Sequence, residues 1–217
     1  MSGHAMSNKR AARWGDPLAV AQKALETISR VAVWIGGAAY IGVCALVAAD
    51  ILLRKFANVT IGGADEISGY VLAVTTAWAL SFTLFQRAHI RIDALYNLLP
   101  VRVCAALDIL ALLALGYLAS LMTWWGHTML LTSISFHATA NTPLQTPLWI
   151  PQSLWWTGLA FFCLTLLVLI LRAGQALLHG DAQQVGRIAG IRTVEDEIES
   201  EIGADRVPHH AKENPAC

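Results

Sequence analysis

The residues that could carry chemistry are two acids and two histidines in or beside long apolar stretches. The acids are Asp50 and Asp108, and the histidines are His127 and His137. An acid inside a membrane-type segment is a candidate for ion binding or proton transfer, and a buried histidine pair is a candidate for haem ligation. A bis-histidine haem site needs ligands at matching depth on two helices, and the other apolar segments contain no interior histidine.

The two acids have a simpler explanation at the ends of their segments. Asp50 lies four residues before Arg54, a spacing that allows an ion pair on one helix face. Asp108 lies within reach of Arg102. Because a charge costs less near a membrane interface than at the mid-plane, we expect both acids to be structural tethers.

The remaining reactive residues form no recognisable site. The four cysteines are isolated, and the absence of a C-x-x-C motif argues against a quinone-linked disulfide oxidase; they are Cys44, Cys104, Cys163 and Cys217. The sequence contains no Walker A motif, metal-ligand cluster or catalytic-triad pattern. We therefore expect no enzymatic activity, no metal and no cofactor.

The elements that hold these residues are indicated by where charge is missing. Of 217 residues, 56% are hydrophobic and only 14% are charged, and residues 109–171 contain no Lys, Arg, Asp or Glu. A bilayer core of about 30 Å needs roughly 20 apolar helical residues. The sequence therefore predicts an all-α integral membrane protein whose four spans cover about 31–53, 67–85, 103–131 and 151–171. The formal net charge of zero argues against a nucleic-acid partner.

The positive-inside rule predicts the orientation of the spans. Basic residues concentrate in the N-terminal tail, residues 1–30, and in the 86–102 loop. We expect both termini and this loop to be cytoplasmic and residues 132–150 to be periplasmic. Pro17 to Ser29 reads as a short amphipathic helix, either on the membrane surface or continuous with the first span. Residues 172–217 are expected to form a cytoplasmic, acidic and largely disordered tail.

Small residues recur every four positions on two of the predicted spans. The first span carries Ala38, Gly42, Ala45 and Ala49, and the second carries Gly69, Ala73, Ala77 and Ser81. Small residues allow helix backbones to approach closely in lipid. These stripes could serve the four-helix fold or a partner subunit, and we favour the fold.

Three motifs together resemble one transporter family. Asp65, Glu66, Ser68 and Gly69 open the second span, and His89, Arg91 and Asp93 follow its end. Pro147, Trp149 and Pro151 precede the fourth span. Over about residues 28–175, the chain resembles the small membrane subunit (DctQ-type, the Q subunit) of tripartite ATP-independent periplasmic (TRAP) transporters. Ala88 stands where the family usually has Gly before the His-x-Arg-x-Asp segment.

The resemblance implies a function that composition and spacing do not show. A Q-type subunit has four spans with both termini inside, in the bacterial inner membrane. It is a non-catalytic scaffold for a large membrane permease (DctM-type), and a periplasmic binding protein (DctP-type) delivers the substrate, often an organic acid. Ion-gradient-driven uptake by that complex is the expected function. The alternatives are a membrane redox protein that uses haem or quinone and a self-contained small exporter.

Overall fold

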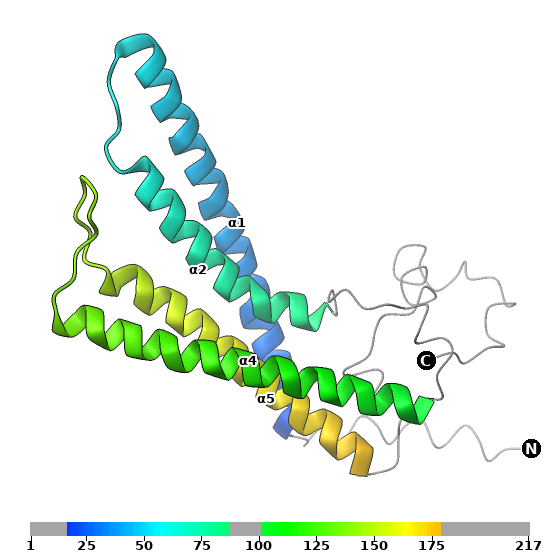
Figure 1. Ribbon diagram of the computed structural model, residues 1–217. Coiled ribbons are helices and arrows are strands. Elements are labelled where there is room, and N and C mark those ends of the chain that lie inside the picture. The colour runs from blue at the N-terminus through cyan, green and yellow to red at the C-terminus, as the bar shows by residue number, and fades with distance from the viewer. Residues whose placement is uncertain (1–16, 87–100, 179–217) are drawn as a thin grey trace, which may run out of the picture.

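The computed structural model describes residues 17–86 and 101–178, which form four helices (Figure 1). These are α1 (Pro17–Ala57), α2 (Ala64–Phe85), α4 (Val101–Ser135) and α5 (Trp149–Leu178). Each is long and apolar enough to cross a membrane. The described residues contain no strand and only one isolated bridge, between Thr139 and Pro147. The prediction of an all-α, four-span membrane protein is confirmed.

The first helix is far longer than its predicted span of 31–53. It begins at Pro17, a residue suited to a first helical turn because its missing N–H needs no partner there. It continues through Arg30, which pairs with Glu26 at 3.1 Å, and ends before Asn58, whose φ of 53° is left-handed. At 1.5 Å per residue its 41 residues extend about 60 Å. Residues 17–29 therefore continue the span instead of forming a separate helix.

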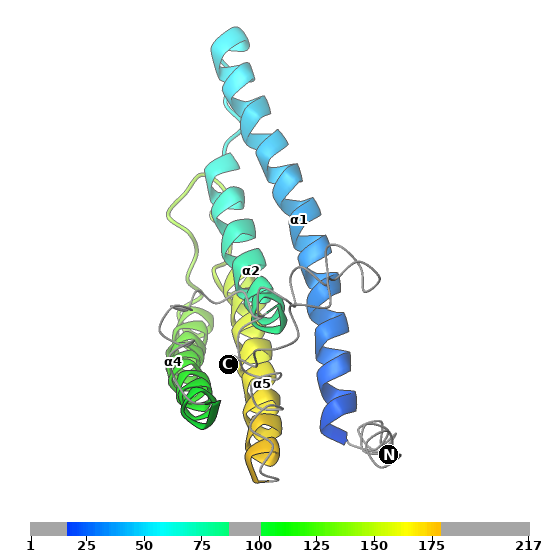
Figure 2. The ribbon, with the colours of Figure 1, turned by 90° about the vertical axis from the view of Figure 1, so that its right-hand side faces the viewer.

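The helices form two antiparallel hairpins that meet through α2 and α5. The hairpin of α1 and α2 and the hairpin of α4 and α5 cross near one end and diverge towards the other (Figure 1). The diverging end, called the loop end below, carries the α1–α2 turn (58–63) and the α4–α5 loop (136–148). Figure 2 shows α1 and α4 on opposite sides of α2 and α5.

A cluster of buried hydrophobic residues joins α2, α4 and α5. This core consists of Leu84, Leu112, Ala119, Phe162, Leu166, Leu169 and Ala173. Beside it, the hydroxyls of Thr165 and Ser81 lie 3.4 Å apart, and neither residue is exposed. Short side chains at this contact let α2 and α5 approach closely. The tightest approach is at Gly158, where an added Cβ would lie 2.8 Å from Trp78 Cδ1 and 3.0 Å from Ala77 Cβ.

The stripe of small residues on α2 packs over only half its length. Ala77 and Ser81 are buried against the neighbouring helices, whereas Gly69 and Ala73 are exposed. The two exposed positions lie nearer the loop end, where the hairpins diverge (Figure 1). The geometry of the hairpins, not the residue type, therefore decides which part of the stripe is covered.

The stripe on α1 faces away from the rest of the chain. Ala38, Gly42 and Ala45 are exposed, and only Ala49 is half-buried. A Cβ added at Gly42 would meet nothing within 4 Å. The buried residues of α1 are Leu25, Ser29, Val43 and Asp50, and Gly36 is half-buried between them. Most of this stripe is therefore exposed in the part of the chain that the structure describes, because four-residue spacing identifies a face but not its neighbour.

Candidate functional site

A buried acid organises the turn between α1 and α2. Asp50 is 4% exposed, and its Oδ2 accepts a hydrogen bond from Arg54 Nη2 at 2.6 Å. Its Oδ1 accepts another from the backbone N–H of Ile61, also at 2.6 Å. Both carboxylate oxygens are therefore engaged, one by the helix of Asp50 and one by the turn. This arrangement ties the turn to the end of α1.

A second acid joins the two hairpins at the loop end. Glu66, in the first turn of α2, accepts a hydrogen bond from Tyr70 at 2.8 Å. It also accepts one from the hydroxyl of Thr142, in the α4–α5 loop, and it interacts with Thr146 of the same loop. Asp65, one residue earlier, is exposed, and its backbone carbonyl accepts from Ser68 Oγ. The two adjacent acids therefore have different surroundings.

The α4–α5 loop also makes an apolar contact with the start of α2. Ala140 donates to the carbonyl of Thr146, and Leu148 donates to that of Ala138, so the loop folds back on itself as a short hairpin. Its tip places Leu144 beside Gly63, which precedes α2 with a φ of 96°. A Cβ added at Gly63 would lie 1.4 Å from Leu144 Cδ1. Only glycine fits both the backbone angle and this contact.

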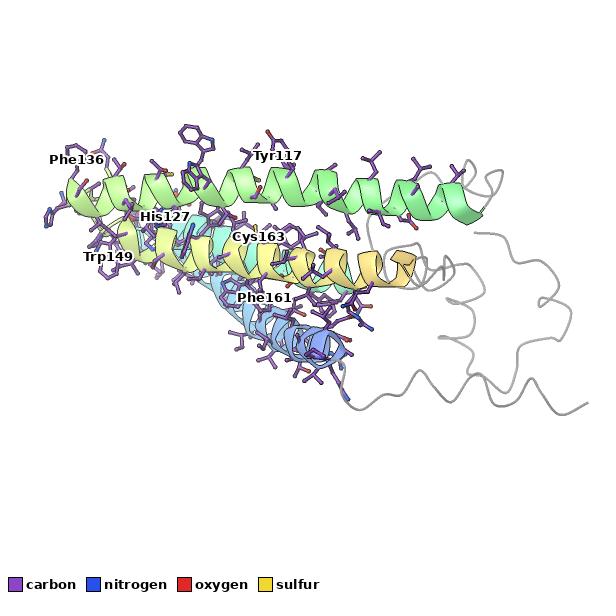
Figure 3. All side chains as sticks on the ribbon, turned by 90° about the horizontal axis from the view of Figure 1, so that it is seen from below. Tyr117, His127, Phe136, Trp149, Phe161 and Cys163 are labelled. Atoms are coloured by element: carbon purple, nitrogen blue, oxygen red, sulfur yellow. The ribbon has the colours of Figure 1, made fainter. Side chains whose placement is uncertain are left out.

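The residues of the motif before the fourth span lie along the loop and the start of α5. Pro147 pairs with Thr139 in the isolated bridge, and Trp149 begins α5 half-exposed (Figure 3). Pro151 lies in the first turn of α5, where the missing N–H costs nothing. The motif thus sets the entry of the chain into α5.

The two histidines do not form a haem site in the structure. His127 lies on α4 and packs beside the ring of Trp156, with centroids 5.3 Å apart (Figure 3). His137 has a φ of 48° and follows the end of α4. The N–H groups of His137 and Ala138 donate to the carbonyls of Ile134 and Ser133, the bonding pattern of a Schellman cap. Its backbone position therefore closes a helix.

The structure describes only some of the other predicted site residues. Asp108 is 3% exposed on α4 and takes part in an interaction, but the side chain of Arg102 lies outside the described residues. So do His89, Arg91 and Asp93. Cys163 Sγ lies 3.2 Å from the hydroxyl of Thr123, between α4 and α5. In the part of the chain that the structure describes, no three His, Cys, Asp or Glu residues gather as a metal site.

Several residues that shape the loop end carry no distinctive sequence signal. The α4–α5 loop reaches the other hairpin, and only this brings three of its residues into contact with the start of α2: Thr142, Leu144 and Thr146. The three closely spaced prolines predict a turned segment, but they do not predict what it touches. Trp78 was also missed, although its Nε1 donates to the carbonyl of Leu154 at 3.1 Å and so links α2 to α5.

Two helix faces are apolar and are not covered by the other residues within 17–86 and 101–178. One is the small-residue face of α1, defined by Ala38, Gly42 and Ala45. The other lies on α4, where Tyr117 points away from the remaining helices (Figure 3). The molecule is therefore a multi-pass membrane protein with apolar faces available to lipid or to another membrane chain.

A comparison with known protein families matches residues 43–175 to the DctQ component of tripartite ATP-independent periplasmic transporters. Since the match covers more than half of the sequence, the chain belongs to this family and is a small membrane subunit of a TRAP transporter. The resemblance drawn from the motifs is confirmed. Comparisons with curated proteins and with solved structures gave no match.

Proposed function

We propose that this chain is a non-catalytic scaffold for a larger DctM-type permease subunit in ion-gradient-driven uptake. The observation that carries the proposal is the small-residue face of α1, which the chain leaves uncovered at Ala38, Gly42 and Ala45. A face of small residues lets another helix approach its backbone closely in lipid. Membership of a multi-component transporter family supports a membrane subunit as that neighbour.

The unbroken helices of the described spans favour a scaffold role over a direct role in transport. Secondary transporters bind substrate and ions near the mid-plane, commonly at interrupted helices. Here α1, α2, α4 and α5 each run as one continuous helix, and the acid Asp50 is engaged by its own helix and turn. The substrate and ion sites accordingly belong to the permease subunit. A DctP-type periplasmic binding protein would deliver the substrate, an organic acid.

The loop end belongs in the periplasm and both termini in the cytoplasm of a bacterial cell. The support is the distribution of Lys and Arg: residues 1–30 contain five and residues 86–102 contain three, against two, Arg54 and Lys55, in the last turn of α1 at the loop end. The α4–α5 loop contains none. In this orientation the loop is available to the docked binding protein, and the bacterial inner membrane is the location.

Reconstitution of the separate components tests the proposal. Vesicles would contain this chain alone, the permease subunit alone, or both, each with binding protein and an imposed ion gradient. We expect substrate uptake only when both membrane subunits are present. Full uptake by the permease subunit alone would make this chain dispensable and would refute the scaffold role.

A bulky substitution on the proposed interface gives a more local test. Ala45→Trp should reduce the amount of permease subunit that co-purifies, because the large ring prevents close helix approach. Cys44→Trp is the matched control, since Cys44 is also exposed on α1 but points about 100° away around the helix. Equal co-purification of the two variants would exclude the α1 stripe as the contact.

A further inference from the structure

We propose that a groove between α1, α2 and α5 holds one acyl chain of a membrane phospholipid. The groove has a volume of about 450 Å³ and lies towards the loop end, where the two hairpins diverge. This inference rests on the membrane embedding of the chain and is independent of the proposed partner.

The groove exists because α1 has small side chains where it faces α2. Ala32, Gly36 and Ala39 line it on α1, with Ile35 at its mouth. At Gly36 the two helices come so close that an added Cβ would lie 3.1 Å from Thr75 Cγ2. The α5 helix does not fill the remaining space, because it belongs to the other hairpin and diverges from α1 there (Figure 1).

The lining of the groove is mostly hydrocarbon, and its few polar side chains donate hydrogen bonds within the protein. None of the lining residues is charged. The hydroxyl of Tyr70 donates to Glu66, the hydroxyl of Thr75 donates to the carbonyl of Val71, and the indole N–H of Trp78 donates to the carbonyl of Leu154. Thr146, the remaining polar residue of the lining, interacts with Glu66. The side-chain donors of Tyr70, Thr75 and Trp78 are therefore already used within the protein, and a hydrocarbon chain needs no polar partner from the lining.

The groove runs along about two turns of α2. The part of α2 that lines it extends from Tyr70 to Trp78, about 12 Å at 1.5 Å per residue. This length accommodates a stretch of one extended acyl chain.

The mouth of the groove is continuous with the surface that faces lipid. Ile35 of α1 and Leu154 of α5 line it and are 66% and 51% exposed. At the loop end, Thr146 and the contacts of Glu66 close it. An acyl chain can thus enter sideways from the bilayer and is limited in depth by the loop. Under the proposed orientation, the lipid comes from the periplasmic leaflet.

Photo-crosslinking in a bilayer tests the occupant directly. The full-length protein, with whatever subunits co-purify, is placed in phosphatidylcholine vesicles containing a phosphatidylcholine with a diazirine on one acyl chain. After irradiation and digestion, mass spectrometry locates the adducts. We expect a several-fold higher adduct yield at Ile35, Val74 and Leu154 than at Ile41, which is exposed on α1 outside the groove. An equal or lower yield in the groove would overturn the proposal.

A variant that fills the groove supplies the second measurement. Ala39→Phe should remove one phospholipid per chain from the lipid retained after detergent purification, as counted by native mass spectrometry. The control is Ala48→Phe, which places the same ring on an exposed alanine of α1 outside the groove. We expect this control to retain the lipid. Unchanged retention in Ala39→Phe, or equal loss in both variants, would show that the groove is not the binding site.

Discussion

At the scale of single residues, adjacent positions of the same type have different surroundings. Asp65 and Glu66 are both acids in the first turn of α2, where negative charge is favourable. Only the carboxylate of Glu66 reaches the α4–α5 loop, through Thr142 and Thr146. Its role in this structure is to join two hairpins that diverge at this end.

Replacement of the two acids should therefore have unequal effects. Glu66→Ala removes the acceptor for Tyr70 and Thr142 and should lower the melting temperature of the purified protein clearly. Asp65→Ala should change it little, since the exposed side chain is replaced without loss of a contact between the hairpins. Thermal unfolding followed by circular dichroism would measure both. In a Thr142→Val background the effect of Glu66→Ala should shrink, because residues in one network are not additive; full additivity would contradict the link.

The glycine pair before α2 gives a second contrast. Gly63→Ala should destabilise the protein by about 1–2 kcal/mol for the left-handed backbone alone, with a further loss from the clash with Leu144. Gly62→Ala should be close to neutral, because its Cβ would make an ordinary contact with Pro143 at 3.8 Å. Unfolding in denaturant would provide the two values. Leu144→Ala should rescue Gly63→Ala only in part, since the backbone strain remains; complete rescue would show that the clash was the whole effect.

At the scale of helices, the number of elements is predictable from the sequence but their neighbours are not. Long charge-free runs such as residues 109–171 identify spans because burying charge in lipid is costly. The ends of the helices are less predictable. The first span was expected to begin after Arg30, whereas α1 begins three to four turns earlier, at Pro17. Spacing also does not predict which face of α1 packs, because Ala38 and Gly42 look like internal packing residues but are exposed. The contact of Glu66 with Thr142 could not be predicted, because it depends on how the hairpins cross.

The crossing of α2 and α5 should depend strongly on one glycine. Gly158→Ala would place a Cβ within 3.1 Å of the backbone nitrogen of Trp78 and closer still to two side-chain atoms. Overpacking of this kind costs about 1–3 kcal/mol. Gly174→Ala is the control on the same helix, since its Cβ would meet nothing within 4 Å. Equal stability of the two variants in detergent unfolding experiments would argue against the close approach.

At the scale of the whole molecule, contacts at both ends hold the two diverging hairpins together. Near the crossing end, Arg172 of α5 donates to Gln22 on the extended part of α1, and the core of α2, α4 and α5 lies between the two ends. At the loop end, Glu66 and Gly63 contact the α4–α5 loop. Such bracing at both ends suits a subunit whose proposed role is to present a fixed helix face to the permease subunit.

The proposed orientation makes a prediction about accessibility that involves both ends of the molecule. In a cysteine-free background, Asn141→Cys in the α4–α5 loop and Val20→Cys near the start of α1 both introduce thiols at exposed positions. If the loop end is periplasmic, as the Lys and Arg distribution indicates, a membrane-impermeant maleimide should label only position 141 in spheroplasts. Position 20 should be labelled only after the inner membrane is permeabilised, which also shows that its thiol is reactive. Labelling of position 20 alone in sealed spheroplasts would invert the orientation, and the surface available to a periplasmic binding protein would then be the opposite end.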